Sequence, residues 1–465
     1  MKAHILKRAL IWPKLLLIGL ALGVVVLGGW ALARHGRNPA QAKAAPGVSE
    51  ALPALPKPTG NSATDRDIAK WAEQARQHPN EDGVWVNLGD ALMQKVRETA
   101  DSSYYAYAER VFARALALNP QNAEAMTGLA WVNGGRHIFD KSIEWARKAI
   151  ALEPRDYQAY GLIGDAQMAL GDYNGAFESY QRMLDIHPDI SSYSRGAYLL
   201  HVAGDNRKAR WLMGKAIKAG APYAENTAWC RVQLALILFS NANLIPAEQV
   251  LKDALAYAPN NYQVLAAMGK IKAAEKDYNA AIDYYKRAIA IVPLHDSLVA
   301  LGDLYRLTGK PEEAEKQYAL VEAVHKILKA NGVRGDMQIA QFYADHDRNL
   351  PEALKLAEAE YVTNKNVYAA DTLAWCYYKN GRYAQARDMI KAALSQHTPE
   401  ASFLFHAGMI YAKLGNIPDA KIYLYRALSM NPNFSPIYGL VASDTLHKLG
   451  SIPPDAVKRV GYAGN

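Results

Sequence analysis

The chain has 465 residues, of which 50% are hydrophobic, and its formal net charge is +8 at pH 7. Residues 1–60 hold eight Lys/Arg and one Glu, so residues 61–465 have a net charge of only +1. A basic footprint for nucleic acid on this larger part is therefore not supported. The two cysteines form no Cys-x-x-Cys pair, which excludes zinc-ribbon, dithiol redox and covalent-haem sites.

An apolar segment, Leu15 to Ala33, follows a basic N-terminus of residues 1–14 and contains nineteen residues without a charge. A helix of about 20 apolar residues spans a bilayer core, so this segment is predicted to be a single transmembrane helix. The alternative is a cleaved secretory signal, because Ala31-Leu32-Ala33 is an A-x-A-like cleavage site. Four Lys/Arg before the segment against three just after it favour a cytoplasmic N-terminus. The rest of the chain would then be extracytoplasmic, in the periplasm or outside the cell, or secreted after cleavage near Ala33.

The region after this segment divides into a linker and a capping helix. Residues 34–64 are rich in Ala and Pro and show no helical apolar period, which predicts a semi-extended linker. An amphipathic helix from Asp65 to Gln77 is predicted to cap the region that follows, so residues 65–81 form the cap. A closing helix from Ser435 to Leu449 is predicted within residues 435–465. Residues 82–434 between the two caps consist of repeats.

The clearest repeat unit runs from Tyr157 to Pro188. Its first helix is predicted from Tyr157 to Leu170, because apolar residues recur at helical spacing and Gly171-Asp172 then breaks the pattern. Its second helix is predicted from about Asn174 to Ile186, since a proline cannot continue a helix. A small residue, Ala176, is expected where the two helices cross most closely.

The same small residue recurs through the chain at spacings of 33 to 39 residues. Its ten positions are Ala108, Ser142, Ala176, Ala209, Ala247, Ala281, Ala314, Ala353, Ala386 and Ala420. The prolines Pro120, Pro154 and Pro188 keep the same period of 34 residues. This period and punctuation resemble the tetratricopeptide repeat. The resemblance implies an all-α fold, a right-handed superhelix (α-solenoid) of about ten helix-turn-helix repeats, in which each pair buries its apolar face against its neighbours.

Three departures from the period are predicted to be insertions. Seven extra residues near Glu98 to Tyr104 must form a loop or lengthen the helices of the first repeat. Four are added around Gly220-Ala221-Pro222, which predicts a longer loop between repeats. Five are added between Ala314 and Ala353, and there the helix that starts at Pro311 is predicted to continue to Ala330 before Asn331-Gly332 ends it.

Signatures of catalysis are absent from the sequence, which contains no phosphate-binding glycine loop, H-E-x-x-H or G-x-S-x-G motif. Cys230 and Cys376 lie about four repeats apart, too far for a disulfide, and are predicted to be buried. Asp345-His346-Asp347 is the nearest approach to a metal site, yet neighbouring residues on a helix point about 100° apart, so a structural role is expected. No enzyme activity, cofactor or metal site is predicted.

Protein binding is therefore the expected activity. The resemblance implies that the first helix of each repeat lines a concave groove, and aromatic residues there are typical of binding hot spots. The alternative is that individual positions belong to the core between repeats. Replacement of Trp375 and Tyr378 by Ala is expected to weaken partner binding with little effect on thermal stability. The residues projected onto the groove are Trp131, Trp229, Phe239, Asp303, Arg306, Phe342, Asp371, Trp375, Tyr378, Lys379 and Met409.

Three functions compete at this stage, of which the third, an enzyme within the solenoid, would need convergent polar groups that the sequence does not show. The first is a membrane-anchored, non-enzymatic scaffold that assembles or stabilises an envelope complex through contacts with a protein partner. The second is a component of envelope export or assembly that binds transient cargo, for polysaccharide, cytochrome or outer-membrane protein. Residues Ile327 to Asp347 and Leu404 to Gly415 also resemble segments of bacterial repeat proteins of unassigned activity, which adds no mechanism.

Overall fold

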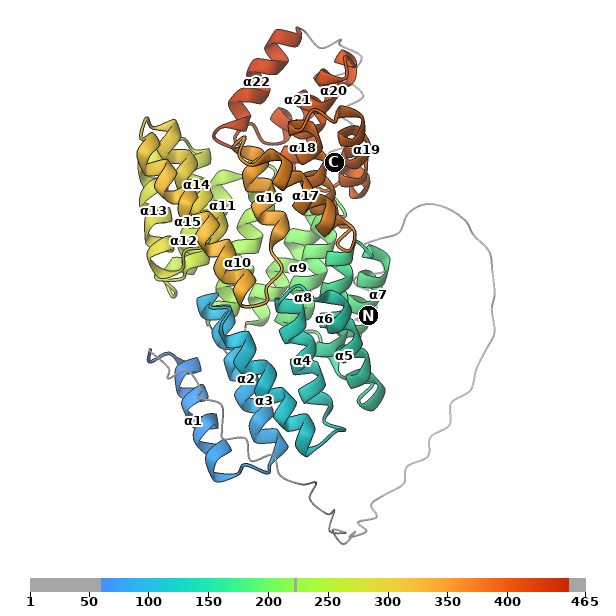
Figure 1. Cartoon of the computed structure of the whole chain (residues 1–465). Helices are drawn as coiled ribbons and strands as arrows, with labels where there is room; N and C mark the ends of the chain where they lie inside the picture. Colours follow the sequence, from blue (N-terminus) through green and yellow to red (C-terminus); the bar gives the residue numbers. More distant parts are fainter. Residues whose placement is uncertain (1–59, 221–223, 451–465) are drawn as a thin grey trace, which may run out of the picture.

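The computed structural model describes residues 60–220 and 224–450, and these are all-helical, with no strand (Figure 1). The predicted transmembrane segment 15–33 and most of the linker lie outside the described residues. Of the helices that are described, none combines the length and apolar character that a membrane span requires. The helices are α1 (Ala63–Gln77), α2 (Asp82–Thr99), α3 (Tyr104–Leu118), α4 (Ala123–Gly135), α5 (Phe139–Leu152), α6 (Tyr157–Leu170), α7 (Tyr173–Ile186), α8 (Ile190–Val202), α9 (Asn206–Ala219), α10 (Ala224–Phe239), α11 (Leu244–Leu255), α12 (Tyr262–Ala274), α13 (Tyr278–Ile291), α14 (His295–Leu307), α15 (Pro311–Ala330), α16 (Asp336–Asp345), α17 (Leu350–Tyr361), α18 (Val367–Lys379), α19 (Tyr383–Ala393), α20 (Ala401–Lys413), α21 (Ile417–Met430) and α22 (Tyr438–Leu449), with a short 3₁₀ helix at Leu394–Gln396.

Ten helix pairs, from α2/α3 to α20/α21, form the solenoid, with α1 and α22 at its ends. The break inside each pair follows from local chemistry. Gly171 ends α6 in the left-handed conformation, at φ 83°, and the Asp172 side chain then caps α7 by accepting a hydrogen bond from the Gly175 N–H at 2.9 Å. The helix predicted from Tyr157 to Leu170 is thus confirmed.

The small residue of each second helix lies at the helix crossing, as the period predicts. All ten positions are buried, each with 1% or less of its surface exposed. The first helices need a glycine for a related reason. A Cβ on Gly164 or Gly302 would overlap the ring of Tyr180 or Tyr318 from the second helix of the same pair. The short distance between paired helices therefore depends on small residues on both sides.

The solenoid coils back onto itself after about six repeats. Helices α4 to α11 are here called the first turn, and helices α16 to α21 the second turn. Polar residues that precede or follow helices of the second turn donate hydrogen bonds to backbone carbonyls at the ends of α4, α6, α8 and α10. The four bonds, with the donor named first, are Arg334 N–H to Arg136 O (3.1 Å), Asn366 Nδ2 to Ala169 O (2.7 Å), Thr398 Oγ1 to Val202 O (2.7 Å) and Asn431 Nδ2 to Phe239 O (2.8 Å). Each pair is separated by 192 to 198 residues.

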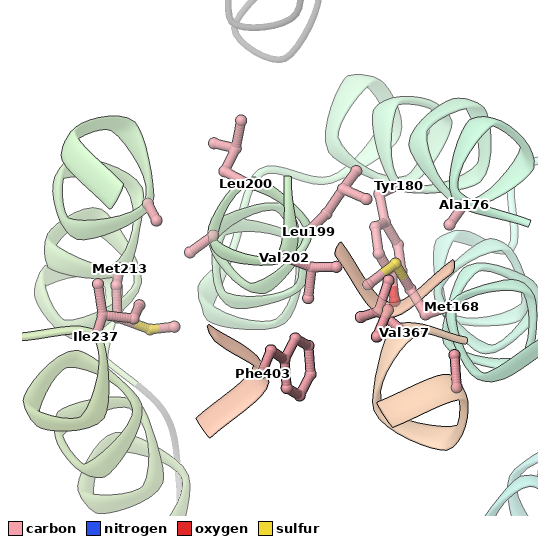
Figure 2. Packing of buried hydrophobic residues seen from close by; sticks show 14 of the residues in the cluster. Met168, Ala176, Tyr180, Leu199, Leu200, Val202, Met213, Ile237, Val367 and Phe403 are labelled. Atoms are coloured by element: carbon pink, nitrogen blue, oxygen red, sulfur yellow. The ribbon is translucent and has the colours of Figure 1, made fainter. Parts of the chain in front are cut away.

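Apolar side chains from both turns share one core. Figure 2 shows Val367 and Phe403 of the second turn among Met168, Tyr180 and Val202 of the first. In Figure 1 the orange and red helices accordingly lie over the teal and green ones. The last backbone carbonyls of a helix have no N–H partner within that helix. The hydrogen bonds from the second turn therefore pair carbonyls of the first turn that would otherwise be buried without a donor.

Two of the three predicted insertions meet in space. Helix α2 is lengthened to 18 residues and ends at Ala100 in the left-handed conformation, and α15 continues to Ala330 as predicted. Asn331, which follows α15, donates from Nδ2 to Ser102 Oγ in the first insertion at 2.8 Å. The third insertion begins at Gly220, with φ of 68°, and its residues 221–223 lie outside the described part.

Several smaller expectations can be compared with the structure. The capping helix predicted from Asp65 to Gln77 lies within α1, whereas the closing helix starts at Tyr438, three residues later than predicted. Cys230 and Cys376 are both buried and free. Burial raises the pKa of each thiol to about 12, so both remain protonated and unreactive near neutral pH.

Candidate functional site

Among the cavities that the described residues form, three are lined largely by residues of the first helices. The lower cavity, of about 870 Å³, is lined by residues from α2 to α16, including Arg97, Tyr105, Trp131, Arg195 and Trp229. The upper cavity, of about 880 Å³, lies between α10, α12, α14, α16, α18, α20 and α22. A smaller middle cavity, of about 360 Å³, shares Phe239, Lys270 and Asp303 with the upper cavity and Gln263 and Leu294 with the lower one.

The upper cavity brings together most of the predicted groove residues. It is lined by seven of the eleven: Phe239, Asp303, Arg306, Trp375, Tyr378, Lys379 and Met409. Trp131 and Trp229 line the lower cavity instead. The remaining two, Phe342 and Asp371, line none of the three cavities.

Phe342 and Asp371 have structural contacts that explain their positions. Phe342 is 1% exposed and packs its ring between Tyr318 and His346 at centroid distances of 5.5 and 4.8 Å. Asp371 is 5% exposed and accepts a two-oxygen hydrogen bond from His406 Nδ1 at 2.9 and 3.0 Å. Their places in the core do not support the prediction that these two residues contact a partner.

Trp375 forms the back wall of the upper cavity. Its ring is stacked between His406, at 4.2 Å, and Tyr378, at 4.6 Å and 5° between the ring planes. Its Nε1 donates to Asp345 Oδ1 at 2.9 Å, and only 2% of the residue is exposed. The expectation that Trp375→Ala leaves stability nearly unchanged is therefore wrong, because this side chain is part of the core.

The Asp345-His346-Asp347 sequence has three separate structural roles. Asp345 accepts hydrogen bonds from Trp375, from Tyr438 Oη at 3.1 Å and from Gln341 Nε2 at 2.9 Å, while burial raises the pKa of its carboxyl group. Asp347 has φ of 54° at the turn after α16 and pairs with Lys379 at 2.6 Å. Across the described ranges, no group of three or more acidic, His or Cys side chains could hold a metal ion.

His346 belongs to a second network on the same wall. Its Nε2 lies 2.7 Å from Asp303 Oδ1, and its Nδ1 lies 2.8 Å from the Phe342 carbonyl. The Tyr318 hydroxyl donates to the same Asp303 oxygen at 2.7 Å. Burial lowers the pKa of His346, but the hydrogen bond and charge of Asp303 outweigh burial and hold the pKa above its usual value. The carboxylates of this cavity thus already have protein donors.

The cations of the upper cavity are less completely paired. Lys270 and Arg306 are both exposed, and neither forms an ion pair within the ranges that the structure describes. Lys270 Nζ lies 4.9 Å from the centre of the Phe239 ring, which leaves its charge available to a ligand beside an aromatic surface. Lys379, in contrast, is neutralised by Asp347.

Several cavity residues were missed in the sequence. Tyr438, Phe405 and His406 could not be placed without the closing helix and its neighbour. Lys270 had a usable signal, because it follows Gly269 in the first helix of its repeat. Asp303 follows Gly302 and Met409 follows Gly408 in the same way, and all three line the upper cavity.

Several charged side chains on the walls of the lower cavity are paired with one another. Arg195 donates from Nε and Nη2 to the two carboxylate oxygens of Asp165 at 2.8 to 3.0 Å. Tyr180 Oη donates to the same carboxylate at 2.8 Å. Arg97 pairs with Glu225 at 3.3 Å. The contacts of Asp165 join the neighbouring pairs α6/α7 and α8/α9, whereas the Arg97–Glu225 pair joins α2 to α10 across the superhelix.

Comparisons with known proteins agree with this architecture. Sequence models described as tetratricopeptide repeat match residues 134–189, 262–293 and 372–433. Small glutamine-rich tetratricopeptide repeat-containing protein 2 of Saccharomyces cerevisiae is 24% identical over 111 residues, which cover 24% of this chain and 32% of that protein. The chain thus matches about a third of the length of this curated relative.

Similar solved structures are also repeat proteins. A tetratricopeptide repeat protein from Parabacteroides merdae is 17% identical, with 56% of this chain and 99% of that chain covered and a TM-score of 0.33. YrrB, a tetratricopeptide repeat protein with an unusual peptide-binding site, is 18% identical, with coverages of 40% and 94% and a TM-score of 0.28.

Proposed function

We propose that this chain, which is built from tetratricopeptide repeats, is a non-enzymatic scaffold that holds a segment of a partner protein in its upper cavity. Tetratricopeptide repeat proteins are generally protein-interaction scaffolds. The observation that carries the proposal is the convergence of seven predicted groove residues on one cavity of about 880 Å³, contributed by four different first helices. A cavity of this size suits a few side chains of an inserted segment.

The cavity walls define the chemistry of the segment that fits. Tyr378, Met409 and Phe434 offer partly exposed apolar surface, which favours an aromatic or aliphatic side chain. Lys270 and Arg306 favour an acidic side chain next to it, because they are the cations without an ion pair among the cavity residues described. The proposed partner segment therefore combines acidic and large apolar residues.

We also propose that the apolar segment 15–33 holds the scaffold in a membrane, with the repeats on the extracytoplasmic side, where they assemble an envelope complex. This part of the proposal is supported by the nineteen uncharged residues and by the charges that flank them. Binding of transient cargo during export is the alternative, and it would use the same cavity.

A photo-crosslinking experiment tests the proposal. A benzoylphenylalanine at Met409, in the upper cavity, is compared with one at Lys286, which is exposed on the second helix α13. We expect a discrete crosslinked partner from position 409 only, and its loss when Arg306→Glu is added. A stoichiometric partner at steady state supports the scaffold, whereas crosslinks confined to newly synthesised protein support cargo binding. Equal crosslinks from both positions would contradict binding in the cavity.

A further inference from the structure

Helix α9 has an unusual outer face. Its sequence, Asn206–Ala219, contains five Lys/Arg and no acidic residue, although residues 61–465 together have a net charge of only +1. At about 100° per residue, four of these cations and one tryptophan fall within an arc of ~140°. The members of this face are Arg207, Arg210, Trp211, Lys215 and Lys218.

The orientation of the face is fixed by the opposite side of the helix. Ala209, Leu212, Met213 and Ala216 are fully buried in the core that the two turns share. Trp211 is left 52% exposed, with Lys215 Nζ 4.7 Å from its ring centre. A Cβ added to Gly214, in the middle of the face, would meet no atom within 4 Å. No described part of the chain therefore covers this position.

The cations of this face lack the partners that other second helices supply. In α5, Lys141 and Lys148 both pair with Glu144, and in α15 Lys316 pairs with Glu313. On α9 only Lys208 has such a partner, Asp205, which precedes the helix. Within residues 60–220 and 224–450, Arg207, Arg210, Lys215 and Lys218 form no ion pair. A cluster of positive charges without acidic partners attracts an anionic surface.

We propose that the outer face of α9 docks on an anionic phospholipid surface. A half-exposed tryptophan flanked by cations matches the membrane interface, where the ring sits at the headgroup level and the cations contact phosphate groups. The inference goes beyond the proposed function but rests on it in one respect. A membrane-anchored array lies next to such a surface, which favours lipid over nucleic acid as the polyanion.

An environment-sensitive fluorophore on Gly214→Cys in the full chain tests this inference. Cys230 and Cys376 are buried, so the new thiol is the one that is labelled. Lys286→Cys on α13 is the matched control, because both positions lie five residues after the small residue of their helix, Ala209 or Ala281. Vesicles of phosphatidylcholine alone are compared with vesicles that also contain phosphatidylglycerol, and a single-stranded oligonucleotide is added in a separate arm.

We expect a blue shift at position 214, but not at position 286, that requires phosphatidylglycerol and weakens at high salt. Replacement of the four unpaired cations by Gln should lower the ratio of shifted to unshifted label on the order of 100-fold or more. Unchanged thermal unfolding would show that this variant is folded. A shift on neutral vesicles, a shift only with the oligonucleotide, or no shift at all would each overturn the inference. If vesicles with and without phosphatidylglycerol both retain the chain but neither produces a shift, α9 docking fails while the anchor stands; if only vesicles with phosphatidylglycerol retain the chain, and the shift is seen there, the anchor fails while docking stands.

Discussion

The side-chain amide of Asn366 donates a hydrogen bond of 2.7 Å to the carbonyl of Ala169, 197 residues earlier in the chain. The same residue caps α18, because its side-chain oxygen accepts from the Ala369 N–H at 3.0 Å. One asparagine thus starts a helix of the second turn and completes the end of a helix in the first. Thr398 and Asn431 repeat the contact in the next two repeats. These hydrogen bonds form a ladder of contacts that holds the second turn of the solenoid against the first.

Loss of one hydrogen bond between the two turns, one rung of this ladder, should lower the free energy of unfolding measurably. Thr398→Val keeps the shape of the side chain but removes the hydroxyl that donates to the Val202 carbonyl. That carbonyl is left buried without its partner, so we expect a loss of about 1–3 kcal/mol in the free energy of unfolding, measured in urea. Hydrogen exchange should also speed up at the end of α8.

Thr308→Val is the matched control for this rung. The Thr308 hydroxyl donates a hydrogen bond to the Leu304 carbonyl at the end of the same helix, α14. The Thr308 N–H donates to that carbonyl as well, so the carbonyl keeps a partner when the hydroxyl is removed. We expect a change within about 0.5 kcal/mol. Equal losses from the two variants would show that the contact between turns has no special weight.

Trp375 should be a determinant of stability. It is 2% exposed, stacked between two rings and bonded to the buried Asp345 carboxylate. Its replacement by Ala leaves a cavity and removes one of the donors to the buried Asp345 carboxylate, so we expect a loss of about 3–5 kcal/mol, measured by denaturant unfolding. Tyr378→Ala removes only one side of the stack from a half-buried position and should cost far less. A Trp375→Ala protein as stable as Tyr378→Ala would contradict this account of the wall.

The helices could be predicted from the sequence because their signals are local. Gly171, Asp172 and Pro188 each act on their own segment of backbone, and the small residue at each crossing has to be small whatever its neighbours are. The extension of α15 to Ala330 is predictable for the same reason, since nothing ends the helix before Asn331-Gly332.

The closure of the superhelix could not be predicted in this way. The bonds from Asn366, Thr398 and Asn431 end on backbone carbonyls, which carry no sequence signature, and their partners lie nearly 200 residues away. The same gap affects the site. Register places Trp375 on the inner face of α18, but the rings that pack against it come from other helices, Phe405 from α20 and Tyr438 from α22. Burial of Trp375 was therefore not apparent.

The two unpaired cations of the upper cavity should act on binding rather than on folding. Arg306→Glu reverses an exposed charge on the cavity wall, so we expect weaker capture of the crosslinked partner by tenfold or more, as an order of magnitude. Stability should change by no more than about 0.5 kcal/mol, because the side chain is exposed. Arg287→Glu, on α13, provides a charge-matched control that should bind normally. Identical binding by the two variants would contradict the role of Arg306.

His346 should make stability depend on pH in a defined direction. Its pKa is raised in the folded protein, since Asp303 favours the protonated ring more than burial disfavours it. Its contribution is thus fully present below the unfolded pKa of about 6.5 and is lost as the pH rises through the higher folded pKa. Denaturant unfolding across this window should show the decline, and His346→Gln should remove it. A decline that persists in His346→Gln would assign it to another group.

The membrane anchor can be tested without reference to the partner. If segment 15–33 spans a bilayer uncleaved, the full chain should remain in the membrane pellet after alkaline carbonate extraction. This result requires that the mature protein retains segment 15–33. The N-terminus of the mature protein is therefore determined by sequencing in the same experiment. Two charges placed in the segment, Leu20→Arg and Val25→Arg, should release the chain, at about 2.5–3.5 kcal/mol of insertion free energy each. A mature N-terminus just after Ala33, with the chain in the soluble fraction, would instead establish the cleaved signal.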